Sequence, residues 1–217
     1  MPARDACLLR DNGVATRRRP QQRRSEATVE ALLECTAALL EARGAAAFST
    51  NLLAAESGIS VRAIYRYFPN KQAVLVELAQ RRSAEWSAAA SAFGDLGDPA
   101  ADWDDVWRGY IRGWLDAVLA APGGRALVVA MRDDPVLRAV DDETNRRFIA
   151  GIAESLQQRR RGLRAATATT VAQVLLRSTV GVLDDAVDLA PAARAVLVDE
   201  LLAMHTAYLR HVLREGA

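Results

Sequence analysis

The chain has 217 residues, of which 51% are hydrophobic and 25% charged, and its formal net charge is only +1. This length allows one large domain or a small domain with a larger one, and the near-neutral charge gives no overall indication of a nucleic-acid partner. The charge is nevertheless uneven, because residues 1–82 carry 13 basic and 8 acidic side chains, whereas residues 83–217 carry 15 and 19.

The two cysteines, Cys7 and Cys35, indicate neither a disulfide framework nor a metal knuckle, and they are consistent with a reducing cytoplasm. No stretch has the composition of a signal peptide or a membrane-spanning helix. The closest, residues 165–183, contains Arg177 and four threonines, so we expect a buried interface helix and a soluble chain without a membrane partner.

The predicted elements begin after residues 1–24, which show no apolar period and predict a mobile basic arm. From there, apolar periodicity and helix-capping residues predict about nine helices and no strand, which is an all-α fold. The predicted helices cover residues 25–43, 49–56, 60–66, 70–92, 102–120, 124–132, 135–160, 165–187 and 192–213.

The stretch AAESGISVRAIYRYFPNKQ, residues 54–72, has the pattern of a helix-turn-helix. Ala54 supplies the small side chain needed where two helices cross, and Gly58 can take the positive φ of the turn. Ile59, Ile64 and Phe68 then hold the second helix against the first. The second helix has a suitable size for the major groove of DNA.

The segment FSTNLLAAESGISVRAIYRYFPNK, residues 48–71, resembles the signature of the tetracycline-repressor (TetR) family of transcriptional regulators. The similarity extends over residues 25–75. This chain departs from the usual pattern in having Leu53 for isoleucine, Ser57 for alanine and Tyr67 for histidine, and it lacks the glutamate of a capping box after Lys71.

The resemblance implies a three-helix DNA-binding domain over residues 25–70 and a larger helical effector-binding and dimerisation domain over residues 71–217. Within the first domain, Arg62 is the candidate for a bidentate contact with guanine, and Val61 can meet a thymine methyl group. Lys71 opposes the helix dipole at a helix start, which favours a role in phosphate binding over a purely solvated side chain. The candidate DNA-binding residues are Ser49, Thr50, Asn51, Ser60, Val61, Arg62, Tyr65, Arg66, Tyr67 and Lys71.

The helix predicted from residue 102 carries an aromatic stripe: Trp103, Trp107, Tyr110 and Trp114 fall within about 60° of one another at 100° per residue. Such a stripe either lines a cavity for an apolar or aromatic effector or forms ordinary core. The resemblance implies a small-molecule pocket among the middle helices. The candidate ligand-binding residues are therefore Trp86, Trp103, Trp107, Tyr110, Trp114, Met131 and Phe148.

The last two predicted helices have large apolar faces, which can be buried within the chain or can meet their copies in a homodimer. Dimerisation is favoured because a single recognition helix makes few contacts with DNA. The residues that mark these faces are Val171, Val174, Leu175 and Val182 on one helix and Leu197, Leu201, Met204, Tyr208 and Val212 on the other.

No catalytic or cofactor motif is evident, and His205 and His211 are predicted on different helix faces, so we expect no enzyme, no metal and no cofactor. The sequence indicates a cytoplasmic regulator that binds a palindromic operator as a dimer. The resemblance favours a repressor released by a small apolar or aromatic effector. The alternative is a DNA-binding activator or architectural protein without an effector.

Overall fold

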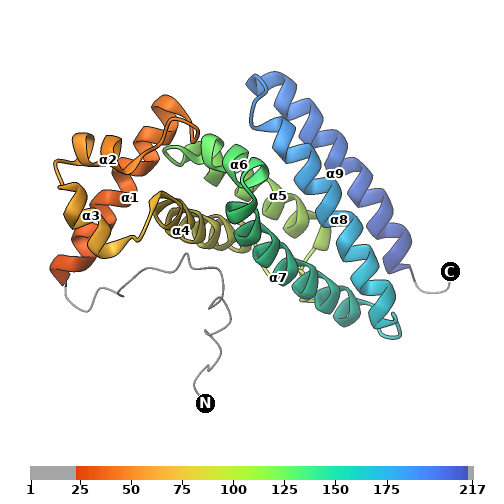
Figure 1. The fold of residues 1–217 in the computed structure, drawn as a ribbon. Helices are drawn as coiled ribbons and strands as arrows, with labels where there is room; N and C mark the ends of the chain where they lie inside the picture. The colour runs from red at the N-terminus through yellow and green to blue at the C-terminus, as the bar shows by residue number, and fades with distance from the viewer. Residues whose placement is uncertain (1–22, 215–217) are drawn as a thin grey trace, which may run out of the picture. The chain divides into compact units, whose positions relative to one another are not determined.

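The computed structural model describes residues 23–214, and these residues form nine α-helices and no strand (Figure 1). This confirms the all-α prediction, with helix bounds that agree to within two residues. The predicted basic arm lies outside the described residues except for its last two positions, which begin α1. The helices are α1 (Arg23–Arg43), α2 (Thr50–Ser57), α3 (Val61–Tyr67), α4 (Lys71–Ser91), α5 (Trp103–Ala120), α6 (Gly124–Asp133), α7 (Pro135–Arg159), α8 (Ala165–Ala186) and α9 (Pro191–Leu213).

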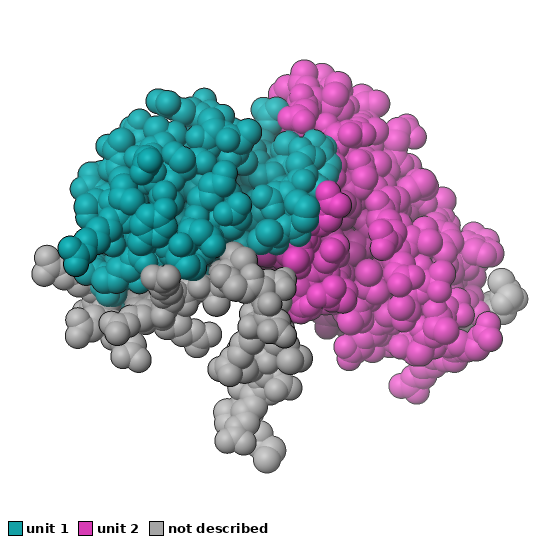
Figure 2. Space-filling view, in the orientation of Figure 1, with its two compact units in different colours: residues 1–81, 122–137 teal, residues 82–121, 138–217 magenta. Residues whose placement is uncertain are grey.

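The chain divides into two compact units, coloured teal and magenta in Figure 2. The first unit comprises residues 1–81 and 122–137, and the second comprises residues 82–121 and 138–217. This division differs from a single boundary at residue 70, because α6 packs on α1 and so joins the N-terminal helices. The long helix α4 contributes residues to both units.

In the first unit, α2 and α3 are short helices whose ends are capped by side chains. Ser49 Oγ accepts a hydrogen bond from Leu52 N, and Ser60 Oγ accepts one from Ala63 N. Between the two helices Gly58 adopts a φ of +68°, as the turn prediction requires. The apolar positions of this region are removed from solvent: Leu53, Ile64 and Phe68 have no exposed surface.

The same unit contains a close approach between α1 and Gly123, the residue that precedes α6. The Gly123 N–H donates to Glu41 Oε2 at 2.8 Å, and the glycine has a φ of +68°. A Cβ at this position would lie 2.4 Å from the backbone oxygen of Ala37. Gly123 is therefore required both by its backbone conformation and by the space that α1 leaves.

In the second unit, a buried chain of hydrogen bonds joins α5, α8 and α9. Trp107 Nε1–H donates to His205 Nδ1 at 3.2 Å, and His205 Nε2 lies 2.8 Å from Ser178 Oγ. Because an indole nitrogen can only donate, Nδ1 is the acceptor and the imidazole proton is on Nε2. Ser178 then donates its own proton to the carbonyl oxygen of Val174. Burial lowers the pKa of His205 to about 4, which keeps the ring neutral at pH 7.

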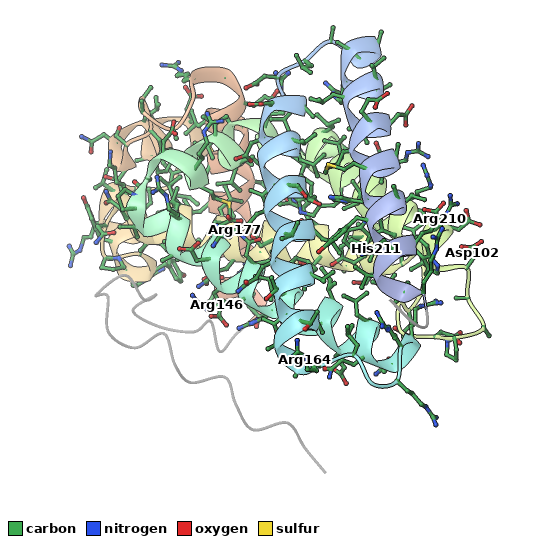
Figure 3. All side chains as sticks on the ribbon, turned by 90° about the vertical axis from the view of Figure 1, so that its right-hand side faces the viewer. Asp102, Arg146, Arg164, Arg177, Arg210 and His211 are labelled. Atoms are coloured by element: carbon green, nitrogen blue, oxygen red, sulfur yellow. The ribbon has the colours of Figure 1, made fainter. Side chains whose placement is uncertain are left out.

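The helices α8 and α9 run side by side and pack on one another, and Figure 3 shows them in front with Arg177 and His211 labelled. Parts of their predicted apolar faces are used inside the chain, since Val171, Leu175, Leu201 and Val212 are buried. Other large apolar side chains on these two helices stay at the surface: Val174, Val196 and Met204.

By length and composition alone, α8 is the one single helix among residues 23–214 that could cross a membrane. A core helix of a soluble protein meets the same requirement. A third of the apolar 18-residue stretch of α8 is buried within the chain. The exposed positions of this helix include Gln173 and Arg177, whose polar side chains are unfavourable in contact with lipid.

The close approach at Gly123 predicts an unusually large loss of stability on adding one methyl group. Gly123→Ala should lower the free energy of unfolding by about 3 kcal/mol, since the left-handed φ is unfavourable for alanine and the Cβ meets a backbone oxygen. Gly44 is a matched control, because it has a φ of +71° and no atom within 4 Å of an added Cβ. Gly44→Ala should lower the free energy of unfolding by only about 1 kcal/mol.

The measurement is urea-induced unfolding of both variants at one fixed protein concentration, because an oligomer makes apparent stability depend on concentration. Equal losses in the two variants would contradict the close approach between α1 and Gly123.

The buried imidazole predicts a pH-dependent loss of stability. The unfolded chain takes up a proton on His205 below a pH of about 6.5, whereas the folded chain does so only below about 4. Stability from the neutral ring is therefore complete above this window and is lost as the pH falls through it. His205→Asn retains one acceptor and one donor without titrating, and between pH 7 and 4.5 the unmodified protein should lose about 2 kcal/mol more than this variant.

Unfolding curves at both pH values give this difference directly, since all other titrating groups are common to the two proteins. A parallel pH dependence of the two proteins would show that His205 is not kept neutral by the fold.

Candidate functional site

The predicted DNA-binding residues lie on α2 and α3, at the caps just before these helices and in the first turn of α4, all within the first unit. The Ser49 and Ser60 hydroxyls cap α2 and α3, so their side chains already have a structural role. Thr50 is buried at the start of α2, and its Oγ1 lies 3.3 Å from the Tyr65 hydroxyl on α3. This contact links the two short helices through two of the predicted residues.

Four other predicted residues have exposed side chains: Asn51, Arg62, Arg66 and Lys71. Arg62 lies in the first turn of α3, and its exposed side chain makes no hydrogen bond or ion pair with the described residues, so its guanidinium can turn toward a ligand. Val61, just before it, is half-buried. The first turn of α3 therefore presents a cation next to a small apolar side chain.

Tyr67 occupies a different position from the other candidates, because its ring is only 7% exposed. Its hydroxyl lies 3.4 Å from Ser25 Oγ on α1 and accepts a hydrogen bond from Arg66 NH2 at 3.0 Å. The hydrogen bond with Ser25, followed by that from Arg66, lowers the pKa of this phenol. The Arg66 guanidinium lies 5.0 Å from the centre of the same ring.

Lys71 is the first residue of α4, as its proposed role requires. Asn70 Oδ1 accepts a hydrogen bond from Ala73 N at 2.9 Å, so asparagine caps this helix although the capping-box glutamate is missing. The exposed Lys71 side chain and the positive end of the α4 dipole together favour an anion.

The aromatic candidates separate into two contacting groups in the second unit. Trp107 stacks on Tyr110 with ring centres 6.2 Å apart, and Tyr110 meets Phe148 edge to face at 5.6 Å. Trp86 and Trp114 form the other group, edge to face at 6.0 Å. These five side chains bring α4, α5 and α7 together within the second unit.

The remaining two ligand-binding candidates are placed differently. Met131 is buried in α6 and belongs to the first unit, so it does not share a unit with the aromatic groups. Trp103 is half-buried at the start of α5. Burial raises the pKa of the Tyr110 hydroxyl, and a hydrogen bond with Ser91 partly opposes this effect. Tyr110 therefore acts as a neutral phenol.

Three residues near these sites were missed by sequence reasoning about function. Ser25 contacts the Tyr67 hydroxyl, and its place just before the apolar stripe of α1 is the only signal that could have indicated it. Phe93 follows α4 and its ring covers two glycines of α5, where a Cβ would lie within 2.4 Å of it. His205 was considered only as a metal ligand, whereas it bonds to Trp107. The sequence signal that could have indicated Phe93 is the pair Gly109 and Gly113, four residues apart on α5, which leaves space for a large side chain.

Residues 23–214 contain no group of three or more His, Cys, Asp or Glu side chains that could hold a metal ion. His205 is buried and His211 exposed, in agreement with their predicted placement on different faces of α9. The arrangement is suited to binding, with exposed cations at one set of helix ends and a group of aromatic rings elsewhere in the chain.

Comparison with solved structures supports this description of the fold. The chain is similar to a TetR-family regulator from Syntrophomonas wolfei (13% identity, TM-score 0.67, 88% of this chain and 99% of that one). It is also similar to a transcriptional regulator from Pseudomonas aeruginosa PAO1 (15%, 0.64, 86% and 94%). A third structure is a complex of SmeT with triclosan (20%, 0.61, 82% and 91%). Among curated proteins, none is significantly similar in sequence.

Two family models match the chain and together span most of the described residues. Residues 32–78 match the model described as bacterial regulatory proteins of the tetR family, which includes α2, α3 and the start of α4. Residues 102–209 match the tetracyclin repressor-like C-terminal domain. Members of this family are transcriptional regulators and not enzymes. With the helix-turn-helix and the all-helical second unit, these matches establish that the chain belongs to the TetR family of DNA-binding transcriptional regulators.

Proposed function

We propose that this regulator is a cytoplasmic repressor that binds a palindromic operator as a homodimer and is released by a small apolar or aromatic effector. The observation that carries the proposal is the first turn of α3, where the exposed Arg62 follows a side-chain cap and a fully buried core. A rigid helix with an exposed arginine at its start is suited to contact base edges in the major groove.

The other candidate residues serve to position α3. Ser60, Tyr65 and the hydroxyl of Tyr67 offer hydrogen bonds to phosphate oxygens, and Thr50 and Asn51 can contact the backbone from the start of α2. Lys71 contributes a charged contact to a phosphate at the start of α4. These contacts fix the register of α3 on the duplex without contributing to sequence preference.

The effector is proposed to bind at the aromatic groups of the second unit. Its support is the contact of five rings from α4, α5 and α7, together with the family resemblance. The triclosan complex of SmeT, a protein of similar fold, gives further support for a small aromatic effector. Since α4 belongs to both units, an effector that binds preferentially when α4 is displaced would favour the state with low DNA affinity.

The alternative function, DNA binding without an effector, has one observation in its favour. Trp86 and Trp107 are 3% and 2% exposed, as expected for ordinary core residues. A compound that lowers operator affinity by binding this unit would exclude the alternative. An activator and a repressor are distinguished by transcription from the promoter with and without the regulator.

The test of the proposed function is fluorescence anisotropy of the protein on DNA taken from beside its own gene. A scrambled duplex serves as the control at about 150 mM salt, where non-specific binding is weak. Selective binding with two protomers per duplex supports the proposal. Equal, weak binding to both duplexes contradicts the proposal that the protein recognises an operator in this DNA.

Substitutions at Arg62 and Lys71 should have different effects on DNA binding. Arg62→Ala should reduce the preference for operator over scrambled DNA by about 10- to 100-fold, since it removes a base contact. Lys71→Gln should weaken binding to both duplexes alike and lower the salt dependence by about one released ion.

Arg43→Ala is a suitable control for both, because Arg43 is an exposed arginine of the first unit that pairs with Glu56 at 3.8 Å and is not among the candidate residues. The anisotropy titration above, repeated at several salt concentrations, gives all three comparisons. An Arg62→Ala protein that still discriminates fully between the duplexes would exclude base contact by this residue.

The exposed apolar side chains of α8 and α9 predict the effect of a charge on dimerisation. Met204 is 51% exposed in the single chain, so Met204→Lys should fold normally. At a dimer interface the ammonium group would be buried without a partner, and the dissociation constant should rise by about tenfold or more. Ala150→Lys, at an exposed position of α7, adds the same charge elsewhere.

Sedimentation velocity over a range of protein concentrations measures both dissociation constants. If Met204→Lys and Ala150→Lys dimerise alike, the apolar surface of α8 and α9 is not the interface.

A further inference from the structure

Two buried N–H groups on α4 have no hydrogen-bond partner among the described residues. They are Arg82 Nε and the indole Nε1 of Trp86. Trp86 is only 3% exposed, so water is largely excluded from its ring. Buried polar groups in folded proteins are nearly always hydrogen-bonded, and two unpaired donors one helical turn apart therefore indicate a missing acceptor.

The two donors cannot satisfy one another. Arg82 and Trp86 are four residues apart and lie on the same face of α4, one turn from each other. Guanidinium and indole nitrogens donate hydrogen bonds and accept none, so any partner must bring oxygen or nitrogen acceptors. Two neighbouring donors on one face match a group with two acceptor atoms.

The rest of the Arg82 guanidinium is fixed by an ion pair. Its NH1 lies 2.7 Å from Glu85 Oε2, and the Glu85 side chain is 57% exposed. The ion pair therefore satisfies the solvent side of the guanidinium while Nε remains buried. A carboxylate on the buried side would gain a charge-assisted hydrogen bond from a group that is already held in position.

Neighbouring polar groups in the same unit already have partners. The indole N–H of Trp107 donates to His205, and the Tyr110 hydroxyl is hydrogen-bonded with Ser91. The missing acceptor is thus specific to Arg82 and Trp86. The Trp86 ring also meets Trp114 edge to face at 6.0 Å, so a second aromatic ring lies next to that of Trp86.

We propose that Arg82 and Trp86 bind the carboxylate of an aromatic acid, whose ring packs against Trp114. The inference rests on the proposed effector function and specifies its ligand: an aryl carboxylate instead of a purely apolar compound. One carboxylate oxygen accepts from Arg82 Nε–H and the other from Trp86 Nε1–H. The aromatic ring is held by Trp86 and Trp114, whose edge-to-face geometry is favourable for a further aromatic contact.

The test compares two probes that share one ring system. 2-Naphthoate carries the carboxylate, and 2-ethylnaphthalene has a substituent of similar size without an acceptor. Equilibrium dialysis against the full-length protein measures both affinities through the fluorescence of the naphthalene ring. The unmodified protein should bind 2-naphthoate about tenfold or more tightly than 2-ethylnaphthalene, because only the carboxylate pairs the two donors.

Two variants remove the donors and one serves as a control. Trp86→Phe retains an aromatic ring, and Arg82→Met retains an unbranched apolar stem, so both should still bind 2-ethylnaphthalene. Each should lose most of the preference for 2-naphthoate. Arg112→Met removes another guanidinium of the same unit, one that pairs with Asp199 at an exposed position, and should leave the preference unchanged.

A spectroscopic measurement keeps the inference testable if a variant folds poorly. In the ¹H–¹⁵N spectrum of the unmodified protein, the indole signal that is missing from Trp86→Phe belongs to Trp86. This signal should move downfield on addition of 2-naphthoate and not of 2-ethylnaphthalene, since a new hydrogen bond deshields the proton.

The outcomes separate this inference from the proposed function. If both probes bind equally, or if the preference survives in Trp86→Phe and Arg82→Met, the carboxylate assignment is wrong while an effector function stands. If neither probe binds, the assignment is also wrong. The effector function is then decided by release of operator DNA in a screen of other small molecules.

Discussion

The helix that is proposed to enter the major groove has only seven residues, and a helix of this length is unstable by itself in water. Its geometry therefore depends on the burial of Ile64 and Phe68, together with Leu53 of the preceding helix, all without exposed surface. The serine caps of α2 and α3 and the left-handed Gly58 fix where each helix begins and ends. The exposed residues of α3 can differ among relatives without loss of the fold, because none of them contributes to this core.

In the second unit, two groups of buried polar side chains differ in whether they have hydrogen-bond partners. Trp107, His205 and Ser178 form a complete chain of hydrogen bonds across three helices, so their polar atoms need no acceptor from a ligand. At Arg82 and Trp86 the donors are equally buried but have no acceptor among the described residues. The same rule of hydrogen-bond satisfaction thus assigns a structural role to one group of residues and a binding role to the other.

The sequence was sufficient for the helices and for the positions of the turns, because these depend on neighbouring residues. The side chains of Ser49, Ser60 and Asp102 each cap the helix that begins at the following residue. The exposed Arg62 and Lys71 also agree with their predicted surface positions, because helical periodicity determines which side chains face away from an apolar stripe.

Contacts between distant segments could not be predicted in this way. The burial of Tyr67 depends on Ser25, 42 residues earlier, and the contact between Trp107 and His205 spans 98 residues. The inclusion of α6 in the first unit depends on its packing against α1, which no local pattern records. Periodicity identifies an apolar face without identifying the helix that covers it. For this reason the aromatic stripe was found while its division into two groups was not.

The division of the chain has a consequence for exchanging parts between regulators. The polypeptide passes from one unit to the other three times, after residues 81, 121 and 137, and the first of these passages lies inside α4. A chimera joined at a single point near residue 81 would receive α1 without its own α6, and Gly123 would face a foreign helix. New combinations of operator and effector specificity should therefore arise more readily by substitutions on fixed helices than by recombination of whole segments.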